Sequence, residues 1–209
     1  MSIGASIRRM FGPYERRVSE AYRSIYLNID EFVEQVRQWS PYPRRILEVG
    51  CGEGAITERL HSAFPNTHIT AIDATSRIGR LYQGPQAGVC FTQCEIQEIG
   101  ASKAGAFDLV VLCDVLHHVP LGSRQGLLDA IRVMLAPHGM FIFKDWQRSN
   151  TPVHWLCYAS DRWLTGDRIT YMTRDEMRQH LALTFGANAL VGEMRVGPRW
   201  NNLSMLVRP

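Results

Sequence analysis

The chain alternates between short apolar runs and longer amphipathic segments. Short continuous apolar runs between glycine, proline or polar clusters are typical of strands that are buried on both faces. Near the C-terminus, two further runs are separated by the turn sequence GPRW and predict an antiparallel hairpin. The pattern therefore predicts strands at residues 44–50, 68–74, 89–96, 107–114 and 139–146, and a hairpin of strands at 189–196 and 201–208.

Apolar residues at helical spacing predict helices between these strands. Residues 14–39 form the first, with Asn28 as a cap inside the segment and Glu31 three residues further on. The last helix opens with Thr173 and Glu176 in the positions of a capping box. This last helix comprises residues 173–185, and the remaining predicted helices comprise residues 55–64, 76–83 and 123–136.

Strands that alternate with helices indicate βαβ units, and hence an α/β fold with a doubly wound, mostly parallel sheet. The C-terminal hairpin completes a predicted sheet of seven strands. We expect residues 1–43 to form an N-terminal helical lid and residues 44–209 the main domain, with an insertion at 147–172. Ligands of such sheets bind at the carboxyl ends of the central strands, so the residues that follow these strands are candidates for a site.

The composition is that of a globular protein, with 45% hydrophobic and 21% charged residues and a net charge of +3. This mild charge, without a run of clustered Lys and Arg, argues neither for nor against a nucleic-acid partner, but the lack of basic patches with interleaved aromatic residues disfavours one. No stretch approaches the length of an apolar membrane span, and the five cysteines show no C-x-x-C spacing. We therefore expect a protein of the reducing cytoplasm, with no membrane partner, disulfide framework or zinc site.

Residues 46–57, ILEVGCGEGAIT, contain a glycine turn directly after a predicted strand. Two interpretations compete. Gly50, Gly52 and Ala55 satisfy the dinucleotide pattern G-x-G-x-x-G/A, with Asp73 about 20 residues on as the acid that binds the ribose. Gly50, Gly52 and Gly54 also form G-x-G-x-G. In this second form ILEVGCGEG resembles motif I of the Rossmann-like, class I S-adenosylmethionine-dependent methyltransferases of the small-molecule type.

Glu48, inside the preceding strand, favours the second interpretation. A dinucleotide would place its pyrophosphate over the turn, at the helix N-terminus, where a nearby carboxylate is repulsive. S-adenosylmethionine has no phosphate and carries an ammonium and a sulfonium, which suit an acidic residue. Glu48 and the turn residues Gly50, Cys51, Gly52 and Gly54 are then expected to bind the cofactor.

The resemblance covers about residues 45–146 and implies further contacts with S-adenosylmethionine, whose product is S-adenosyl-L-homocysteine. Asp73 would accept hydrogen bonds from both ribose hydroxyls, and Ala74 would lie near the adenine. Glu95 stands where the family usually has Asp, accepting from the adenine amino group, and Ile96 would pack on the ring. Cys113 ends the fourth strand, near the methionine part and the transferred methyl.

The segment FDLVVLCDVLHHVP (107–120) resembles the fourth motif of these enzymes, and two histidines follow its strand. An imidazole titrates near neutrality, so it can accept a proton from a hydroxyl or an amine. The resemblance favours His118 as the catalytic base and His117 as a residue that braces the loop. The interpretation that both histidines are structural stays open.

A metal-assisted mechanism is an alternative, because Asp114 and Asp145 end adjacent predicted strands and Asn150 follows. Methyltransferases of the catechol type hold a divalent cation with such residues. Their second Asp is directly followed by the Asn, whereas Gln147 and Arg148 intervene here. We therefore expect no metal.

The sequence thus predicts an enzyme that transfers a methyl group from S-adenosylmethionine to a small-molecule acceptor, as a monomer or homodimer. O- or N-methylation is expected, as in natural-product or secondary metabolism. The N/D-P-P-Y/F and Pro-Cys signatures of nucleic-acid methyltransferases are absent from the sequence. One alternative is a module that binds the cofactor without transferring methyl, for regulation or for a cofactor-assisted non-methyl reaction. An NAD-dependent oxidoreductase is disfavoured, because no Tyr-x-x-x-Lys pair occurs.

The acceptor is expected between an aromatic insertion and the N-terminal segment. Loops at the carboxyl edge of a parallel sheet commonly build substrate walls. Packing between the insertion and the main domain would explain the same residues, and this alternative stays open. Arg162 and Arg168 could pair with an anionic acceptor. The aromatic residues concerned are Trp146, Trp155, Tyr158, Trp163 and Tyr171 in the stretch 145–172, and Tyr14, Tyr22 and Tyr26 in the lid.

Overall fold

A computed structural model describes residues 12–99, 103–160 and 169–209 of the chain. Its centre is a seven-stranded sheet in the order β3-β2-β1-β4-β5-β7-β6. Strands β1 to β5 are parallel, and β7 pairs antiparallel with both β5 and β6. This confirms the predicted fold class. The strands are β1 Arg45–Val49, β2 His68–Asp73, β3 Val89–Gln93, β4 Phe107–Cys113, β5 Leu135–Trp146, β6 Leu190–Arg195 and β7 Asn202–Val207.

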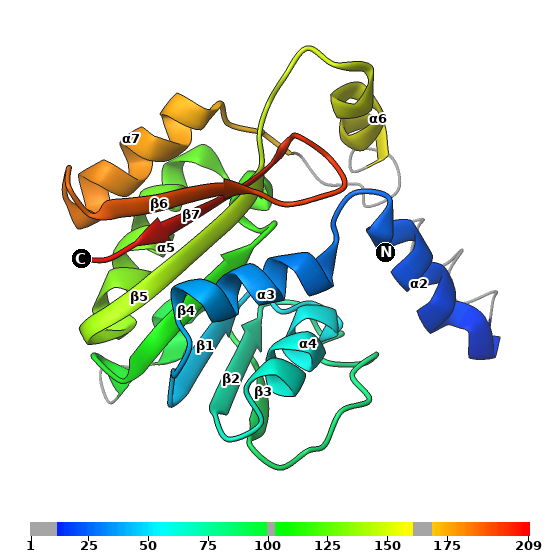
Figure 1. The fold of residues 1–209 in the computed structure, drawn as a ribbon, viewed down its shortest axis with the longest axis horizontal. Helices are drawn as coiled ribbons and strands as arrows, with labels where there is room; N and C mark the ends of the chain where they lie inside the picture. The colour runs from blue at the N-terminus through cyan, green and yellow to red at the C-terminus, as the bar shows by residue number, and fades with distance from the viewer. Residues whose placement is uncertain (1–11, 100–102, 161–168) are drawn as a thin grey trace.

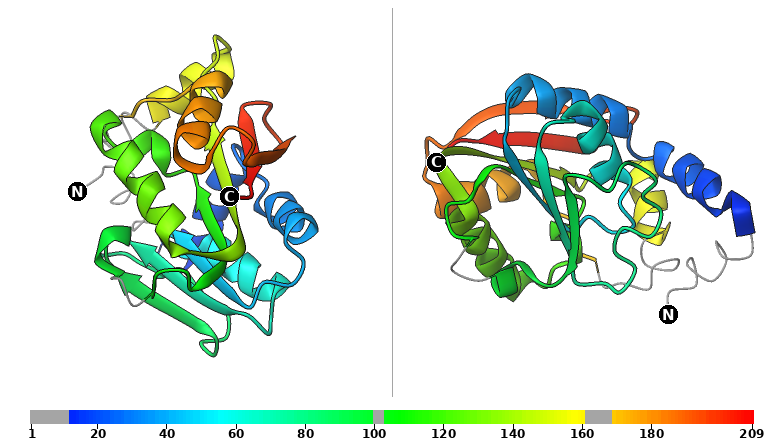
Figure 2. Two further views of the ribbon diagram at one scale, coloured as in Figure 1. Left: turned by 90° about the vertical axis from the view of Figure 1, so that its left-hand side faces the viewer. Right: turned by 90° about the horizontal axis from the view of Figure 1, so that it is seen from below.

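Helices cover both faces of the sheet, with α3 and α4 on one face and α5 and α7 on the other (Figures 1 and 2). Two further helices, α2 and α6, lie beyond the strand ends. No helix among the described residues is long and apolar enough to cross a membrane. The α-helices are α2 Glu15–Ser24, α3 Ile29–Trp39, α4 Ala55–Ala63, α5 Leu121–Met134, α6 Pro152–Ser160 and α7 Arg174–Phe185, with 3-10 turns η1 Gly12–Tyr14, η2 Ile96–Ile99 and η4 Leu116–His118.

The sheet is buried on both faces because successive side chains of a strand point to opposite sides. On β1, Leu47 packs in the core cluster shared with α5 and α7, whereas Ile46 packs in the cluster shared with α3 and α4. Short strands that are apolar at almost every position thus fill two cores. This explains why the apolar runs predicted the strands well.

Helix boundaries follow the caps that the sequence contains. The Asn28 side chain accepts a hydrogen bond from the Glu31 N–H at the start of α3. Thr173 and Glu176 form the predicted capping box at the start of α7, each side chain accepting from the backbone N–H of the other. Both contacts satisfy N–H groups that have no partner inside a helix.

Two predicted helices differ from the structure. Residues 14–39 form two helices, because the chain leaves helical geometry before the Asn28 cap. The predicted helix at 76–83 is wrong, since this segment forms turns. Gly79 there has a φ of +63°, and a Cβ added to it would lie 2.8 Å from the Phe91 ring. That left-handed residue, pressed against β3, interrupts any regular helix.

The N-terminal segment divides into two parts with different packing. Helix α3 buries Phe32, Val33 and Val36 in the same cluster as residues of β1, β4 and β5, so it is part of the sheet domain. Helix α2 has only Ser19 as a buried residue among those assigned to it. Of the lid predicted at residues 1–43, α3 is thus part of the sheet domain and residues 1–11 lie outside the described part. That α2 acts as a lid stays a prediction.

Candidate functional site

The turn after β1 has a backbone that glycine alone adopts readily. Gly50, Gly52 and Gly54 have φ angles of +77°, +52° and +90°. A Cβ on Gly50 would lie 2.2 Å from Val115 Cγ2, so the turn is pressed against the segment after β4. By contrast, a Cβ on Gly52 would meet no atom within 4 Å. The backbone at Gly52 is therefore open to a ligand.

Asp73, at the end of β2, stabilises this turn. Its Oδ2 accepts a hydrogen bond from the Gly52 N–H at 2.8 Å, and its Oδ1 accepts from the Thr75 N–H at 2.8 Å. A carboxylate has about four acceptor positions, so it can receive further donors from a ligand. Asp73 thus links the first two strands at the edge where the site is expected.

Two grooves open on either side of the turn. The larger has a volume of about 670 Å³ and we name it the β2-side groove. The smaller, of about 290 Å³, is the α2-side groove. Gly50, Asp114 and His118 line both, so the grooves meet at these residues, which we name the junction. An elongated ligand that occupies both grooves must cross the junction.

The grooves contain ten of the twelve residues that the sequence singled out. Asp73, Ala74, Glu95 and Ile96 line the β2-side groove. The α2-side groove contains Cys51, Gly52, Cys113 and His117, and the junction contains Gly50 and His118. Two of the twelve, Glu48 and Gly54, line neither groove. Gly54 instead precedes α4 as its N-cap residue.

Glu48, on β1, is only 2% exposed and lies beside Thr57 of α4. None of the described residues donates a hydrogen bond to its Oε2 atom. Burial raises the pKa of Glu48 to about 7; the Thr57 side chain opposes this rise, and the charge of Asp73 adds to it. Glu48 is therefore a buried acid that titrates near neutrality, without direct access to either groove.

His117 is held by Asp145, a contact that the sequence did not reveal. The two residues come from η4 and the end of β5, and His117 Nδ1 lies 2.5 Å from Asp145 Oδ1. The His117 N–H also donates to Asp145 Oδ2, and the Trp146 N–H donates to Oδ1. Burial would raise the pKa of Asp145, but the His117 contacts, the Trp146 N–H and the Lys144 charge lower it overall. The ionised carboxylate can thus orient the imidazole ring.

Asp114, His117 and Asp145 bring their ligand atoms within 4.8 Å of one another, a spacing that could suit a metal ion. However, Lys144 Nζ lies 2.5 Å from Asp114 Oδ2, and Asp145 accepts the three hydrogen bonds described above. A cation would compete with the Lys144 ammonium for Asp114. These contacts do not favour a metal, and Asn150, the third residue of the metal alternative, is an exposed residue outside the cluster.

Aromatic side chains form much of the α2-side groove. Tyr22, Tyr26, Trp146 and Tyr171 line it, and the Tyr26 and Trp146 rings meet edge to face at 5.9 Å. The Tyr171 ring lies 4.8 Å from the His117 ring. Three other aromatic residues expected there, Tyr14, Trp155 and Tyr158, are exposed and do not line the groove. Trp163, Arg162 and Arg168 lie outside the described residues.

Several residues of the grooves were missed by sequence reasoning. Val115 lines the β2-side groove, and Arg23 and Asn202 line the α2-side groove. The position of Val115 just after β4 was a usable signal, since strand ends converge at this edge. Arg23 and Asn202 carried none, because only the folded chain brings α2 and β7 to the same groove.

The comparisons with known proteins agree with this geometry. Residues 47–141 match the family model described as a methyltransferase domain. The ubiquinone biosynthesis O-methyltransferase of Bordetella avium (strain 197N) is 30% identical over 111 residues, which cover 51% of this chain and 44% of that protein. The matched segment of this chain is therefore similar to methyltransferases. The alignment spans less than half of that relative's length.

Solved methyltransferase structures share the fold over a larger part of the chain. The 1,6-didemethyltoxoflavin-N1-methyltransferase of Burkholderia thailandensis, with S-adenosylhomocysteine bound, superposes with a TM-score of 0.67 at 17% identity, covering 98% of this chain and 87% of that one. The N-methyltransferase NodS of Bradyrhizobium japonicum WM9, also with S-adenosylhomocysteine, gives a TM-score of 0.65 at 22% identity and 90% coverage of both chains. At such identities the likeness establishes the fold.

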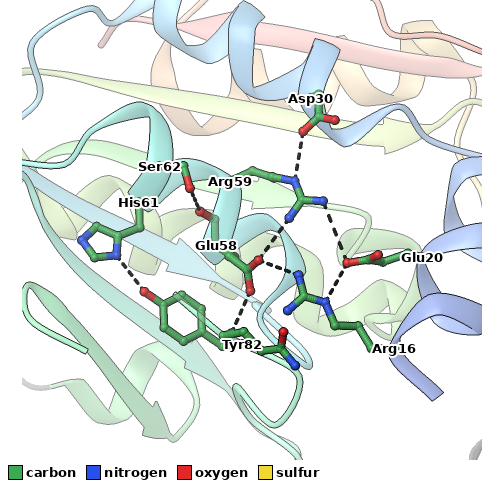
Figure 3. A network of polar contacts seen from close by, with 9 residues as sticks. Arg16, Glu20, Asp30, Glu58, Arg59, His61, Ser62 and Tyr82 are labelled. Carbon is green, nitrogen blue, oxygen red and sulfur yellow. Dashed lines mark hydrogen bonds and ion pairs between the residues drawn. The ribbon is translucent and has the colours of Figure 1, made fainter. Parts of the chain in front are cut away.

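Ion pairs connect α2, which lies outside the matched segment, to the sheet domain (Figure 3). Arg16 on α2 pairs with Glu58 on α4 at 2.7 Å, and Arg59 on α4 pairs with Glu20 at 3.9 Å and with Asp30 on α3 at 3.0 Å. These charged contacts hold α2 where its residues Ser19, Tyr22 and Arg23 line the α2-side groove.

Proposed function

We propose that this protein transfers a methyl group from S-adenosylmethionine to a small-molecule acceptor. The observation that carries the proposal is the junction, where two grooves meet at Gly50, Asp114 and His118 beside the oriented His117. One groove can hold the nucleoside of the cofactor. The other can hold the methionine end and the acceptor, so that both reactants meet beside a base.

The polar residues that line the β2-side groove fit this cofactor. Asp73, Glu95 and Asp114 line the groove, and none of the described lining residues is Lys or Arg. Such a groove suits a cationic ligand without phosphate and disfavours the pyrophosphate of a dinucleotide. Asp73 and Ala74 would hold the ribose and adenine, with Glu95 at the adenine amino group and Ile96 against the ring.

The α2-side groove would receive the methionine end over the open backbone at Gly52. Its lining also includes Arg23, and a guanidinium suits the methionine carboxylate. Glu48, which lines neither groove, would act on the positive methionine end through charge alone. When bound, S-adenosylmethionine would supply a methyl group on a positively charged sulfur: the acceptor's lone pair forms a bond to the methyl carbon, the carbon–sulfur bond breaks, and the sulfur keeps that electron pair as the neutral thioether of S-adenosylhomocysteine.

His117 is the base that the geometry favours. Its Nδ1–H donates to the Asp145 carboxylate, which leaves Nε2 as the proton acceptor of the ring. This reverses the order of the two histidines expected from the sequence, because Asp145 orients His117. His118, at the junction, would position the reactants. Removal of a proton suits a hydroxyl or an amine acceptor, and the aromatic walls suit a small organic molecule.

Calorimetry with S-adenosylmethionine, S-adenosylhomocysteine and NAD tests the cofactor. Binding of the first two without NAD is expected, and tight NAD binding alone would overturn the proposal. Incubation with methyl-labelled cofactor and a metabolite extract tests transfer, which mass spectrometry detects as a product one methyl heavier. Cofactor binding without any labelled product would favour the module that binds without transferring methyl.

A further inference from the structure

Lys144 and Asp114 form an ion pair whose two ends differ in exposure. Lys144 Nζ lies 2.5 Å from Asp114 Oδ2, and the lysine side chain is 1% exposed whereas the aspartate side chain is 34% exposed. The cation is therefore sealed inside the protein. The carboxylate faces outward, at the junction that both grooves share.

The backbone fixes the position of this carboxylate. Asp114 has a φ of +55°, a left-handed conformation that is uncommon for a residue other than glycine. Its N–H donates to the Lys144 carbonyl at 2.9 Å, and the preceding Cys113 is paired with Lys144 across β4 and β5. Unusual conformations of this kind persist where the surrounding structure imposes them, often at functional sites.

The surroundings make the charge of Lys144 consequential. Desolvation alone would lower the pKa of Lys144, but the attraction of Asp114 and other neighbours raises it overall, so the lysine stays protonated. Asp145, on the opposite side of β5, is engaged by His117. The grooves themselves carry the acidic side chains of Asp73, Glu95 and Glu53.

We propose that Lys144 sets the negative charge that Asp114 presents at the junction, and thereby tunes how tightly the sulfonium of S-adenosylmethionine is held. This inference rests on the proposed function. The sulfur loses its positive charge during methyl transfer, so an unneutralised carboxylate would stabilise the ground state more than the transition state. A protonated lysine beneath the carboxylate weakens that attraction and leaves the methyl easier to transfer.

Affinities for S-adenosylmethionine and S-adenosylhomocysteine test the inference, because the two ligands differ in the methyl and in the charge on sulfur. Calorimetry on Lys144→Met should show the ratio of the two affinities shifted about tenfold toward S-adenosylmethionine. Asp114→Asn should shift the ratio about tenfold in the opposite direction. The double variant, which removes both charges, should return the ratio to within about threefold of the wild-type value.

Lys103→Met is the matched control, since Lys103 is exposed and lines neither groove. If Lys144→Met does not fold, Asp114→Asn and the double variant answer the same question. Equal changes for both ligands, or none, would overturn the role of Lys144 while leaving the proposed function intact. A wild-type protein that binds neither ligand would overturn the proposed function and this inference with it.

Discussion

The N–H of Gly52 donates to Asp73 Oδ2 at 2.8 Å, so the residue that ends β2 stabilises the turn that follows β1. The same carboxylate lines the β2-side groove. Asp73 therefore has two proposed roles in cofactor binding, one through the ribose and one through the shape of the turn. Its removal should affect both.

We expect Asp73→Ala to weaken S-adenosylhomocysteine binding by at least about tenfold, because charge-assisted hydrogen bonds contribute about 1.5–3 kcal/mol. Calorimetry measures the affinity, and circular dichroism checks the fold. Asp73→Asn retains one oxygen acceptor for the turn, so its loss should be smaller than that of the alanine variant. An alanine variant that folds and binds as tightly as wild type would remove Asp73 from the site.

Turnover should depend on the orientation of His117. His117→Ala should lower turnover about 10²–10⁴-fold, as expected for loss of a general base. Asp145→Asn should lower turnover substantially as well, because an amide does not hold the imidazole tautomer as the carboxylate does. Wild-type turnover should fall as the pH decreases, since a protonated imidazole cannot accept a proton.

His118→Ala is the control for the two histidines. If His117 is the base, the His118 variant should lose less turnover and retain the wild-type pH profile. The opposite ranking would restore the assignment of His118 as base that the sequence favoured. Near-wild-type turnover in both variants would mean that the reaction proceeds by alignment of the reactants alone.

The stability of the ligand-free protein should fall between about pH 4.5 and pH 7. Glu48 ionises near 4.5 in the unfolded chain, whereas burial raises its pKa to about 7 in the folded protein. Within this window the unfolded state has released the proton that the folded state still holds, so the free energy of unfolding decreases as the pH rises. Above pH 7 the contribution is constant, with a total loss on the order of 3 kcal/mol.

Glu48→Gln should remove this decrease, because the amide does not ionise. Urea unfolding at pH 5 and pH 8 measures the free energies. Glu34→Gln, at an exposed residue of α3, should keep the wild-type difference between the two pH values. A Glu48→Gln variant with that same difference would show that another group causes it.

The α2 helix should loosen when its ion pairs are weakened. Arg16→Met removes the contacts with Glu20 and Glu58, and such partly exposed pairs contribute up to about 1 kcal/mol. Hydrogen exchange at residues 15–24 should accelerate by up to about fivefold, and raised ionic strength should have a similar effect on wild type.

Arg37→Met is the matched control for this variant. Arg37 pairs with Glu34 inside α3, so its loss should leave exchange in α2 unchanged. Exchange in α2 that is the same in Arg16→Met and wild type would show that other contacts hold the helix.

The sequence by itself determined the sheet and the turn. A short apolar run such as Ile46 and Leu47 indicates burial on both faces, a property of each strand alone. Gly50, Gly52 and Gly54 indicate a local backbone conformation with positive φ, which other residues adopt at a cost in free energy. The caps at Asn28 and Thr173 are likewise local, because the contacts span three residues. Such features could be predicted from neighbouring positions.

Only the tertiary structure decided which side chains share the site. Asp145 meets His117, and Lys144 meets Asp114, across strand ends separated by about thirty residues, and both contacts require the β4–β5 register. The burial of Glu48 away from both grooves depends on α4 covering its face of β1. The local sequence pattern does not predict these contacts, because parallel pairing brings distant strand ends together. Packing then decides toward which face of the sheet each side chain points.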